Sequence, residues 1–278
     1  MLSRVLTLTL AIAALAGCGG TDPDPPTEGK QQVVAGFYPL EFLAERIGGD
    51  AVSVTTLAQP GAEPHDLELK PSQALKIADA DLVLYLKGFQ PELDEAVEQK
   101  TSGKSFDAAT VSPLAGEDPH IWLDPSRMAT LADAVGRELG KPEAAAALRT
   151  ELTKLDTEFS AGLKDCQRRQ IVTSHDAFGY LARRYQLEQI PITGLTPESE
   201  PTPQQLQEVK QKAQQSGATT IFFETLVSPT VAETLANEIG AKTAVLDPLE
   251  GLEAGSGKDY FSVMRTNLET LREALGCS

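Results

Sequence analysis

The stretch Glu117-Asp118-Pro119-His120-Ile121-Trp122-Leu123-Asp124-Pro125 divides this chain of 278 residues and holds its single tryptophan. Before it, strand-like and helical patterns alternate, whereas two helical patterns follow it without a strand between them. The stretch also carries His120, one of only three histidines. It therefore marks both a change of architecture and a candidate functional residue.

Patterns on the N-terminal side of this stretch predict a first α/β lobe. Apolar runs at residues 33–37, 52–57 and 82–86 are typical of strands buried in a parallel sheet, and a weaker strand is expected around Phe106. Apolar residues at helical spacing separate these runs, beginning with a segment that ends at Gly48-Gly49. The order strand, helix, strand is the signature of an α/β unit.

The C-terminal side predicts a second lobe after a helical boundary. Apolar stripes at residues 128–139 and 148–163 indicate two successive helices, which interrupt the alternation. Strand-like runs then return at residues 171–173, 219–223 and 243–246, again with helical patterns between them. We expect the division between the lobes to lie within the helical pair.

All three histidines follow predicted strands. His65 lies in the loop after residues 52–57, His120 after the weak strand, and His175 directly after residues 171–173. Taken singly, each could be a hydrogen-bonded surface residue. Taken together they suggest one metal site, because neutral imidazole is the commonest protein ligand for zinc and similar ions. The spacings of 55 and 55 residues match no local metal motif.

The chain resembles the metal-binding receptors of bacterial zinc and manganese ABC importers, the cluster 9 solute-binding proteins. The stretches that carry the resemblance occur in the family's order and are spread over most of the chain. They are Pro60-Gly61-Ala62-Glu63-Pro64-His65-Asp66-Leu67-Glu68, Asp118-Pro119-His120-Ile121-Trp122-Leu123-Asp124-Pro125, Thr173-Ser174-His175-Asp176-Ala177-Phe178-Gly179-Tyr180 and Leu246-Asp247-Pro248-Leu249.

The resemblance implies two α/β lobes with parallel-type sheets flanked by helices, joined by a long rigid helix, with a metal site in the cleft between them. Ligands of open α/β sheets do lie beyond the carboxyl ends of the strands. The expected division is a signal peptide at 1–17, a flexible tether at 18–30, an N-terminal lobe at 31–142, a linking helix at 143–164 and a C-terminal lobe at 165–278.

The resemblance also implies a ligand set of His65, His120, His175 and Asp247. Three imidazoles and one carboxylate suit tetrahedral Zn²⁺. The alternative for Asp247 is an ordinary Asp-Pro turn after a strand, in which case Glu63 or a water would take the fourth place. Glu224 is expected to support the site from behind, and Trp122 to pack beneath it. The histidine-rich loop of many zinc-specific relatives is missing before His120.

The N-terminus predicts export. An apolar run from Val5 to Gly17 follows Arg4 and is too short to span a bilayer. Leu15-Ala16-Gly17-Cys18 resembles a lipoprotein signal, which implies lipidation of Cys18; an ordinary cleaved signal is the alternative. The remaining two cysteines, Cys166 and Cys277, are predicted to form a disulfide, because an oxidising compartment preserves such bonds.

The predicted function is an extracytoplasmic receptor, anchored to the membrane by a lipid, that captures Zn²⁺ with high affinity and delivers it to an ABC permease with its ATPase. It is expected to be a monomer and not an enzyme. The formal charge of −16 argues against a nucleic-acid partner. The alternatives are a manganese or iron receptor of the same family, with Mn²⁺ as the weaker ligand here, a zinc hydrolase, and an adhesion protein with an incidental metal.

Overall fold

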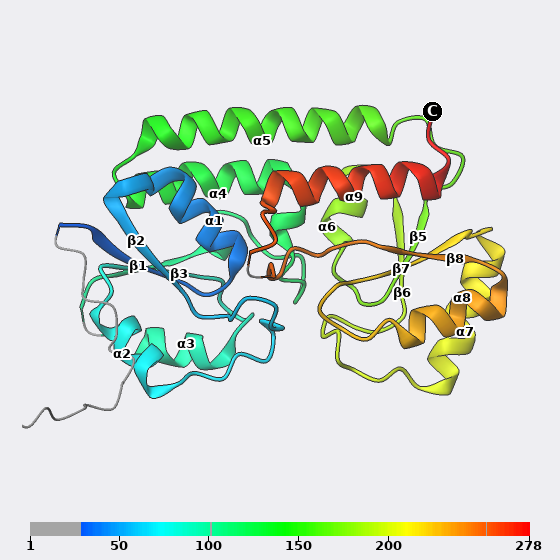
Figure 1. Cartoon of the computed structure of the whole chain (residues 1–278), viewed down its shortest axis with the longest axis horizontal. Coiled ribbons are helices and arrows are strands. Elements are labelled where there is room, and N and C mark those ends of the chain that lie inside the picture. The colour runs from blue at the N-terminus through cyan, green and yellow to red at the C-terminus, as the bar shows by residue number, and fades with distance from the viewer. Residues whose placement is uncertain (1–28, 101, 254) are drawn as a thin grey trace, which may run out of the picture.

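The computed structural model describes residues 29–100, 102–253 and 255–278, which form two α/β halves side by side (Figure 1). The first half contains a parallel sheet of order β2-β1-β3-β4. Its strands are β1 (Gln31–Ala35), β2 (Val52–Thr56), β3 (Leu82–Tyr85) and β4 (Lys104–Asp107). The second half repeats this topology in a parallel sheet of order β6-β5-β7-β8. Its strands are β5 (Gln170–Thr173), β6 (Glu188–Pro191), β7 (Thr220–Phe223) and β8 (Lys242–Val245).

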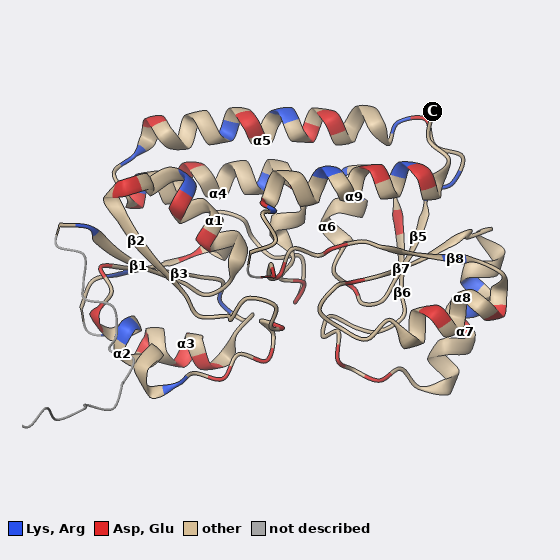
Figure 2. Ribbon diagram, viewed as in Figure 1, with Lys and Arg blue, Asp and Glu red and all other residues tan. Residues whose placement is uncertain are grey.

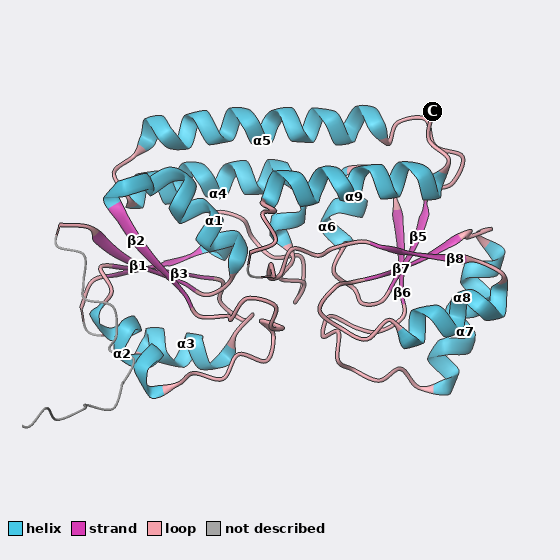
Figure 3. Ribbon diagram, in the orientation of Figure 1, coloured by secondary structure: helices cyan, strands magenta, loops and turns pink. Residues whose placement is uncertain are grey.

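Helices cover both faces of each sheet, as the apolar strands require (Figure 3). In the first half, α2 (Pro71–Asp79) and α3 (Pro91–Glu98) lie below the sheet, and α1 (Tyr38–Gly48) and α4 (Pro125–Glu138) lie above it. In the second half, α7 (Pro203–Gln215) and α8 (Thr230–Ile239) lie below, and α6 (Gly179–Arg184) and α9 (Tyr260–Leu275) lie above.

The long helix α5 (Pro142–Gly162) runs along the top of both halves (Figure 1). It packs against α4 and α1 of the first half and against α9 of the second. Leu148, Leu152, Leu155 and Phe159 form its buried stripe, as the spacing of these residues predicts. The helix expected at residues 143–164 overlaps α5, which begins one residue earlier and ends two residues earlier.

Alternation along the strands distributes side chains between separate cores. Val33 and Ala35 of β1 enter a core that extends through both halves, while Val34 between them enters a smaller core below the first sheet. Successive strand residues point to opposite faces, so a continuous apolar run must be covered on both sides. A third core lies below the second sheet around Val172 and Ile221.

Aromatic residues join the two halves near the centre of the shared core. Phe42 of α1 stacks on Tyr260 of α9 with ring centroids 5.2 Å apart. The Tyr260 hydroxyl donates to the Trp122 carbonyl at 2.7 Å, and the Trp122 indole donates to the Pro248 carbonyl at 2.7 Å. These buried contacts fix the loop after β8 against the stretch that carries His120.

Cys166 and Cys277 form a disulfide that joins the segment after α5 to the end of α9. Arg168 and Ser278 support the same junction through backbone hydrogen bonds from their N–H groups to Leu275 and Asp165. Cys18, the expected lipidation site, lies outside the described residues, as do the expected signal peptide and most of the tether. Among the described helices, none is long and apolar enough to cross a membrane.

Candidate metal site

The three histidines meet between the two sheets. His65 lies in the loop between β2 and α2, His120 immediately before a 3₁₀ turn at Ile121–Leu123, and His175 directly after β5. Glu250, from the loop after β8, joins them. Figure 3 shows that loops of both halves converge in this region. The carboxyl ends of the parallel strands are therefore where the site forms, as expected for open α/β sheets.

The four donor atoms have the spacing of a tetrahedral metal site. Glu250 Oε1 lies 2.9 Å from His120 Nε2, 3.3 Å from His175 Nε2 and 3.4 Å from His65 Nε2. His120 Nε2 and His175 Nε2 are 3.4 Å apart, and no two donors are more than 4.8 Å apart. Ligand distances of about 2.0–2.1 Å give a tetrahedron edge of about 3.3 Å, so four of the six edges are already close to that length.

Two carboxylates orient the buried imidazoles from behind. Asp118 Oδ1 lies 2.9 Å from His120 Nδ1, and Glu224 Oε1 lies 2.8 Å from His175 Nδ1. A carboxylate accepts a hydrogen bond from a ring N–H, so Nδ1 carries a hydrogen in each ring and Nε2 is the nitrogen that faces Glu250. The sequence-based role of Glu224 as a supporting residue agrees with this geometry, and Asp118 is a second such residue that the sequence reasoning missed.

Burial and negative charge dominate the electrostatics of the site. The side chains of His120, His175 and Glu250 are all 0% exposed, and that of His65 is 9% exposed. Burial alone lowers the pKa of His175, but hydrogen bonds to Glu224 and Glu250 outweigh it and raise this pKa to about 10. For His120, likewise, Asp118 and Glu250 overcome the effect of burial and raise the pKa. The site therefore favours positive charge.

Glu63 adds another carboxylate near His65. Its Oε1 lies 3.9 Å from His65 Nε2 and accepts the His65 backbone N–H at 3.1 Å. Burial, followed by the charge of Glu250, raises the pKa of Glu63 to about 8. Figure 2 shows acidic residues on the loops between the sheets. This concentration of carboxylates attracts cations to the space between the halves.

Asp247, which the resemblance implied as the fourth ligand, is not brought into this group. Its Oδ1 instead accepts the Leu249 N–H at 2.8 Å, and its backbone N–H and carbonyl are bonded to the Asn267 side chain. Leu249 has a left-handed φ of 58°, which costs a non-glycine residue about 1–2 kcal/mol. Asp247 thus stabilises the turn that directs Glu250 inward, and Glu250 occupies the place predicted for Asp247.

Trp122 packs beneath the site, as the sequence suggested. It is 1% exposed, and its ring lies 5.2 Å from that of His120. The rings of Phe37 and Phe89 also pack against the Trp122 indole. Phe89 in addition contacts the His65 ring edge to face, with ring centroids 4.6 Å apart. An aromatic floor of this kind excludes water and strengthens the electrostatic interactions within the site.

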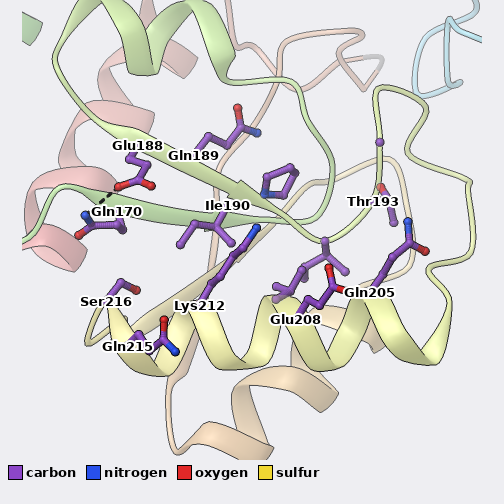
Figure 4. A pocket seen from close by; sticks show the side chains of 14 residues that line it. Gln170, Glu188, Gln189, Ile190, Thr193, Gln205, Glu208, Lys212, Gln215 and Ser216 are labelled. Carbon is purple, nitrogen blue, oxygen red and sulfur yellow. Dashed lines mark hydrogen bonds between the residues drawn. The ribbon is translucent and has the colours of Figure 1, made fainter.

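A separate open cavity of about 580 Å³ lies in the second half between β6 and α7 (Figure 4). Its lining mixes polar side chains such as Gln205 and Glu208 with apolar ones such as Ile190 and Val209, and Gln170 donates to Glu188 at 3.0 Å. The 14 lining residues include no histidine or cysteine. A borderline metal ion would therefore find nitrogen ligands among the converging loops and not in this cavity.

The combination of two similar α/β halves with converging donors from both places the chain in the class of two-lobed solute-binding receptors. A family model described as zinc-uptake complex component A, periplasmic (ZnuA), matches residues 33–274. The chain belongs to the ZnuA family. This membership and the two parallel sheets confirm the fold class predicted from the sequence.

Individual relatives agree with this assignment. Zinc-binding protein AdcA of Streptococcus pyogenes serotype M6 is 36% identical over 289 residues, covering 88% of this chain and 56% of AdcA. The chain thus spans little more than half the length of that relative. The high-affinity zinc uptake system protein ZnuA of Bacillus subtilis strain 168 is 31% identical, covering 98% of this chain and 97% of its own. The crystal structure of the Zn(II)-bound ZnuA-like domain of Streptococcus pneumoniae AdcA matches with a TM-score of 0.76 and 33% identity. The match covers 89% of this chain and 99% of that domain.

Proposed function

We propose that this protein is an extracytoplasmic receptor that captures Zn²⁺ and delivers it to an ABC permease. The observation that carries the proposal is the convergence of three imidazole Nε2 atoms and one buried carboxylate oxygen on a single point between the lobes. A buried carboxylate held against buried imidazoles needs a compensating positive charge to be stable. A divalent cation supplies that charge, and relatives with zinc in their names make zinc the candidate cargo.

The proposed ligands are His65, His120, His175 and Glu250. An N₃O set with tetrahedral spacing suits Zn²⁺, whereas Mn²⁺ prefers more oxygen ligands and a larger coordination number. The same set supports a receptor and not a hydrolase, because four protein donors complete a four-coordinate zinc ion and leave no position for an attacking water. Manganese remains the weaker alternative cargo.

The rest of the chain is assigned around this site. We propose lobes at residues 31–142 and 165–278, joined by a helix at 143–164, with residues 18–30 as a tether. A lipid on Cys18 would hold the receptor at the outer face of the membrane, near a permease driven by its ATPase. A Streptococcus pneumoniae relative is named a zinc-binding lipoprotein, which supports the anchor.

Metal binding by the purified protein tests the proposal. Competition calorimetry with Zn²⁺ and Mn²⁺ should give about one zinc per chain and a clear preference for zinc. His120→Ala serves as the matched loss-of-site control, since it removes the donor closest to Glu250. Equal affinity for the two metals, or zinc binding that His120→Ala leaves unchanged, would contradict the proposed cargo and site. Mass spectrometry of membrane-extracted protein should find acyl mass on Cys18.

A further inference from the structure

Tyr180, on the short helix α6 of the second lobe, lies between two arginines from different lobes. Arg127 comes from α4 and Arg183 from α6, and each guanidinium carbon lies 4.5 Å from the centroid of the Tyr180 ring. A cation over a tyrosine ring at this distance is attracted by the ring's electron density. The side chains therefore form a contact between the lobes in which the buried Tyr180 is the central member.

The Tyr180 hydroxyl binds the segment that precedes His120. It accepts the Ala115 N–H at 2.6 Å and donates to the Asp118 carbonyl at 3.0 Å, so one phenol holds both ends of residues 115–118. Arg127 holds the preceding part of the same segment, because its Nη1 donates to the Ser112 hydroxyl and the Pro113 carbonyl. The position of this first-lobe loop thus depends on a second-lobe side chain.

Asp118 connects this segment to the metal site. Its Oδ1 is the partner of both the His120 backbone N–H and His120 Nδ1, while its Oδ2 lies 3.5 Å from Arg183 Nη2. The absence of a side chain at Gly179 permits the approach of α6, since a Cβ there would lie 2.8 Å from Asp118 Oδ2. An unbroken chain of interactions therefore runs from α6 to the imidazole.

We propose that Tyr180 and Arg183 are positioning residues that hold Asp118, and through it His120, in the metal-binding arrangement, and thereby slow the release of zinc. The inference rests on the proposed function and deepens it. Because the contact crosses between the lobes, a movement of α6 away from the first lobe frees residues 115–118 and loosens His120. Release of the ion is thus coupled to the separation of the lobes at this point.

The expected effects follow from the hydrogen bonds that each substitution removes. Tyr180→Phe eliminates both hydroxyl hydrogen bonds and retains the ring between the arginines. Loss of a group that directly supports a ligand weakens metal binding by about 10–100-fold, and Tyr180 acts on such a group and not on the ligand itself. We expect zinc to dissociate about 3–10-fold faster from Tyr180→Phe and about 2–5-fold faster from Arg183→Gln, with Arg183→Lys recovering part of the effect.

The same helix and the residue after it supply matched controls. Tyr185 donates its hydroxyl to Asp156 Oδ1 at 3.0 Å, and Arg184 pairs with Asp156 at 2.7 Å, on the side of α6 that faces α5. Tyr185→Phe and Arg184→Gln therefore remove equivalent groups whose hydrogen bonds go to α5 and not to residues 112–118. These substitutions should change stability without changing the rate of zinc release.

The test is stopped-flow measurement of zinc release to a chromophoric chelator, with thermal melting of each variant and the visible spectrum of its Co²⁺-loaded form. Faster release and an altered Co²⁺ spectrum in Tyr180→Phe and Arg183→Gln, but in neither control, are the expected results. Equal release rates in Tyr180→Phe, Tyr185→Phe and the unmodified protein would overturn the inference. If Tyr180→Phe fails to fold, an Arg183→Gln release rate equal to that of the unmodified protein would overturn it instead. Failure of the unmodified protein to bind zinc would instead reject the proposed function.

Discussion

Replacement of Glu250 by glutamine tests most directly which carboxylate completes the site. Glu250 is completely buried, and its Oε1 lies within 3.4 Å of all three histidine Nε2 atoms. Glutamine keeps the shape of the side chain and an oxygen donor but removes the negative charge. We expect Glu250→Gln to fold and to bind zinc more weakly, because a neutral amide oxygen is a poorer zinc ligand than a carboxylate.

The size of the effect can be estimated from four-ligand zinc sites. These bind zinc with about 10–16 kcal/mol, or about 2.5–4 kcal/mol for each ligand. The amide oxygen of glutamine retains part of the binding free energy that the Glu250 carboxylate contributes. Loss of the Glu250 charge also lowers the pKa of His120 and His175, which weakens the competition by protons. A net loss of about 2–3 kcal/mol, corresponding to about 30–150-fold in dissociation constant, is expected.

Competition titration against a chelator of known affinity measures this change, and Asp247→Asn is the control. Asparagine at this position can still accept the Leu249 N–H through its side-chain oxygen, so the turn should persist. Asp247→Asn should therefore alter zinc affinity by less than about threefold, or about 0.7 kcal/mol. Greater weakening by Asp247→Asn than by Glu250→Gln would refute the assignment of Glu250 and restore Asp247 as the ligand.

Three further predictions concern the metal, the pH and the disulfide. His175→Glu should weaken zinc and narrow its advantage over manganese in competition calorimetry, because a carboxylate favours harder ions; unchanged affinities would contradict the role of His175. The pKa values of His175 and Glu63 are raised in the fold to about 10 and about 8, so the protonated forms of these groups stabilise the metal-free protein at low pH. This stabilisation is lost as the pH rises through those values. The increase in Tm caused by zinc should therefore grow from about pH 6 to about pH 9, and calorimetric scans showing a constant or shrinking increase would reject this. Replacing Cys166 and Cys277 together by serine should lower the free energy of unfolding by about 2–5 kcal/mol in denaturant titrations and leave zinc affinity unchanged; unchanged stability would count against the bond.

The alternation of apolar runs predicted α/β lobes with buried strands, but not the ends of their elements. The first strand was expected at residues 33–37, whereas β1 ends at Ala35. The next residue, Gly36, accepts a hydrogen bond from the Gln90 side chain at 3.2 Å, and a Cβ at Gly36 would lie 2.5 Å from Gln90 Oε1. Phe37 then turns to pack against Trp122. These contacts join residues far apart in sequence, and no local pattern contains them.

The histidines could be predicted because they are rare and follow strands, whereas Glu250 also follows a strand but belongs to a common residue type. It is one of 40 acidic residues and lies beyond the strand end, after a turn. Its inward direction depends on the left-handed conformation of Leu249, an unusual state that local propensity does not favour. A weak signal was available, because Glu250 has only apolar residues and a glycine as its immediate neighbours, namely Pro248, Leu249, Gly251 and Leu252. An acidic residue that is exposed to water more often has polar neighbours.

Charge and geometry have different roles at this site. The carboxylates of Asp118, Glu224 and Glu250 surround the two buried imidazoles, so the metal-free site is stabilised by protons, as the raised pKa of His175 shows. A divalent cation can replace those protons, and charge alone would admit any such ion. In the proposed site the choice among ions would come from the three nitrogen donors, whose Nε2 atoms are directed inward by the carboxylates on their opposite side. We therefore expect the same carboxylates to attract cations in general and, by fixing the imidazoles, to favour zinc in particular.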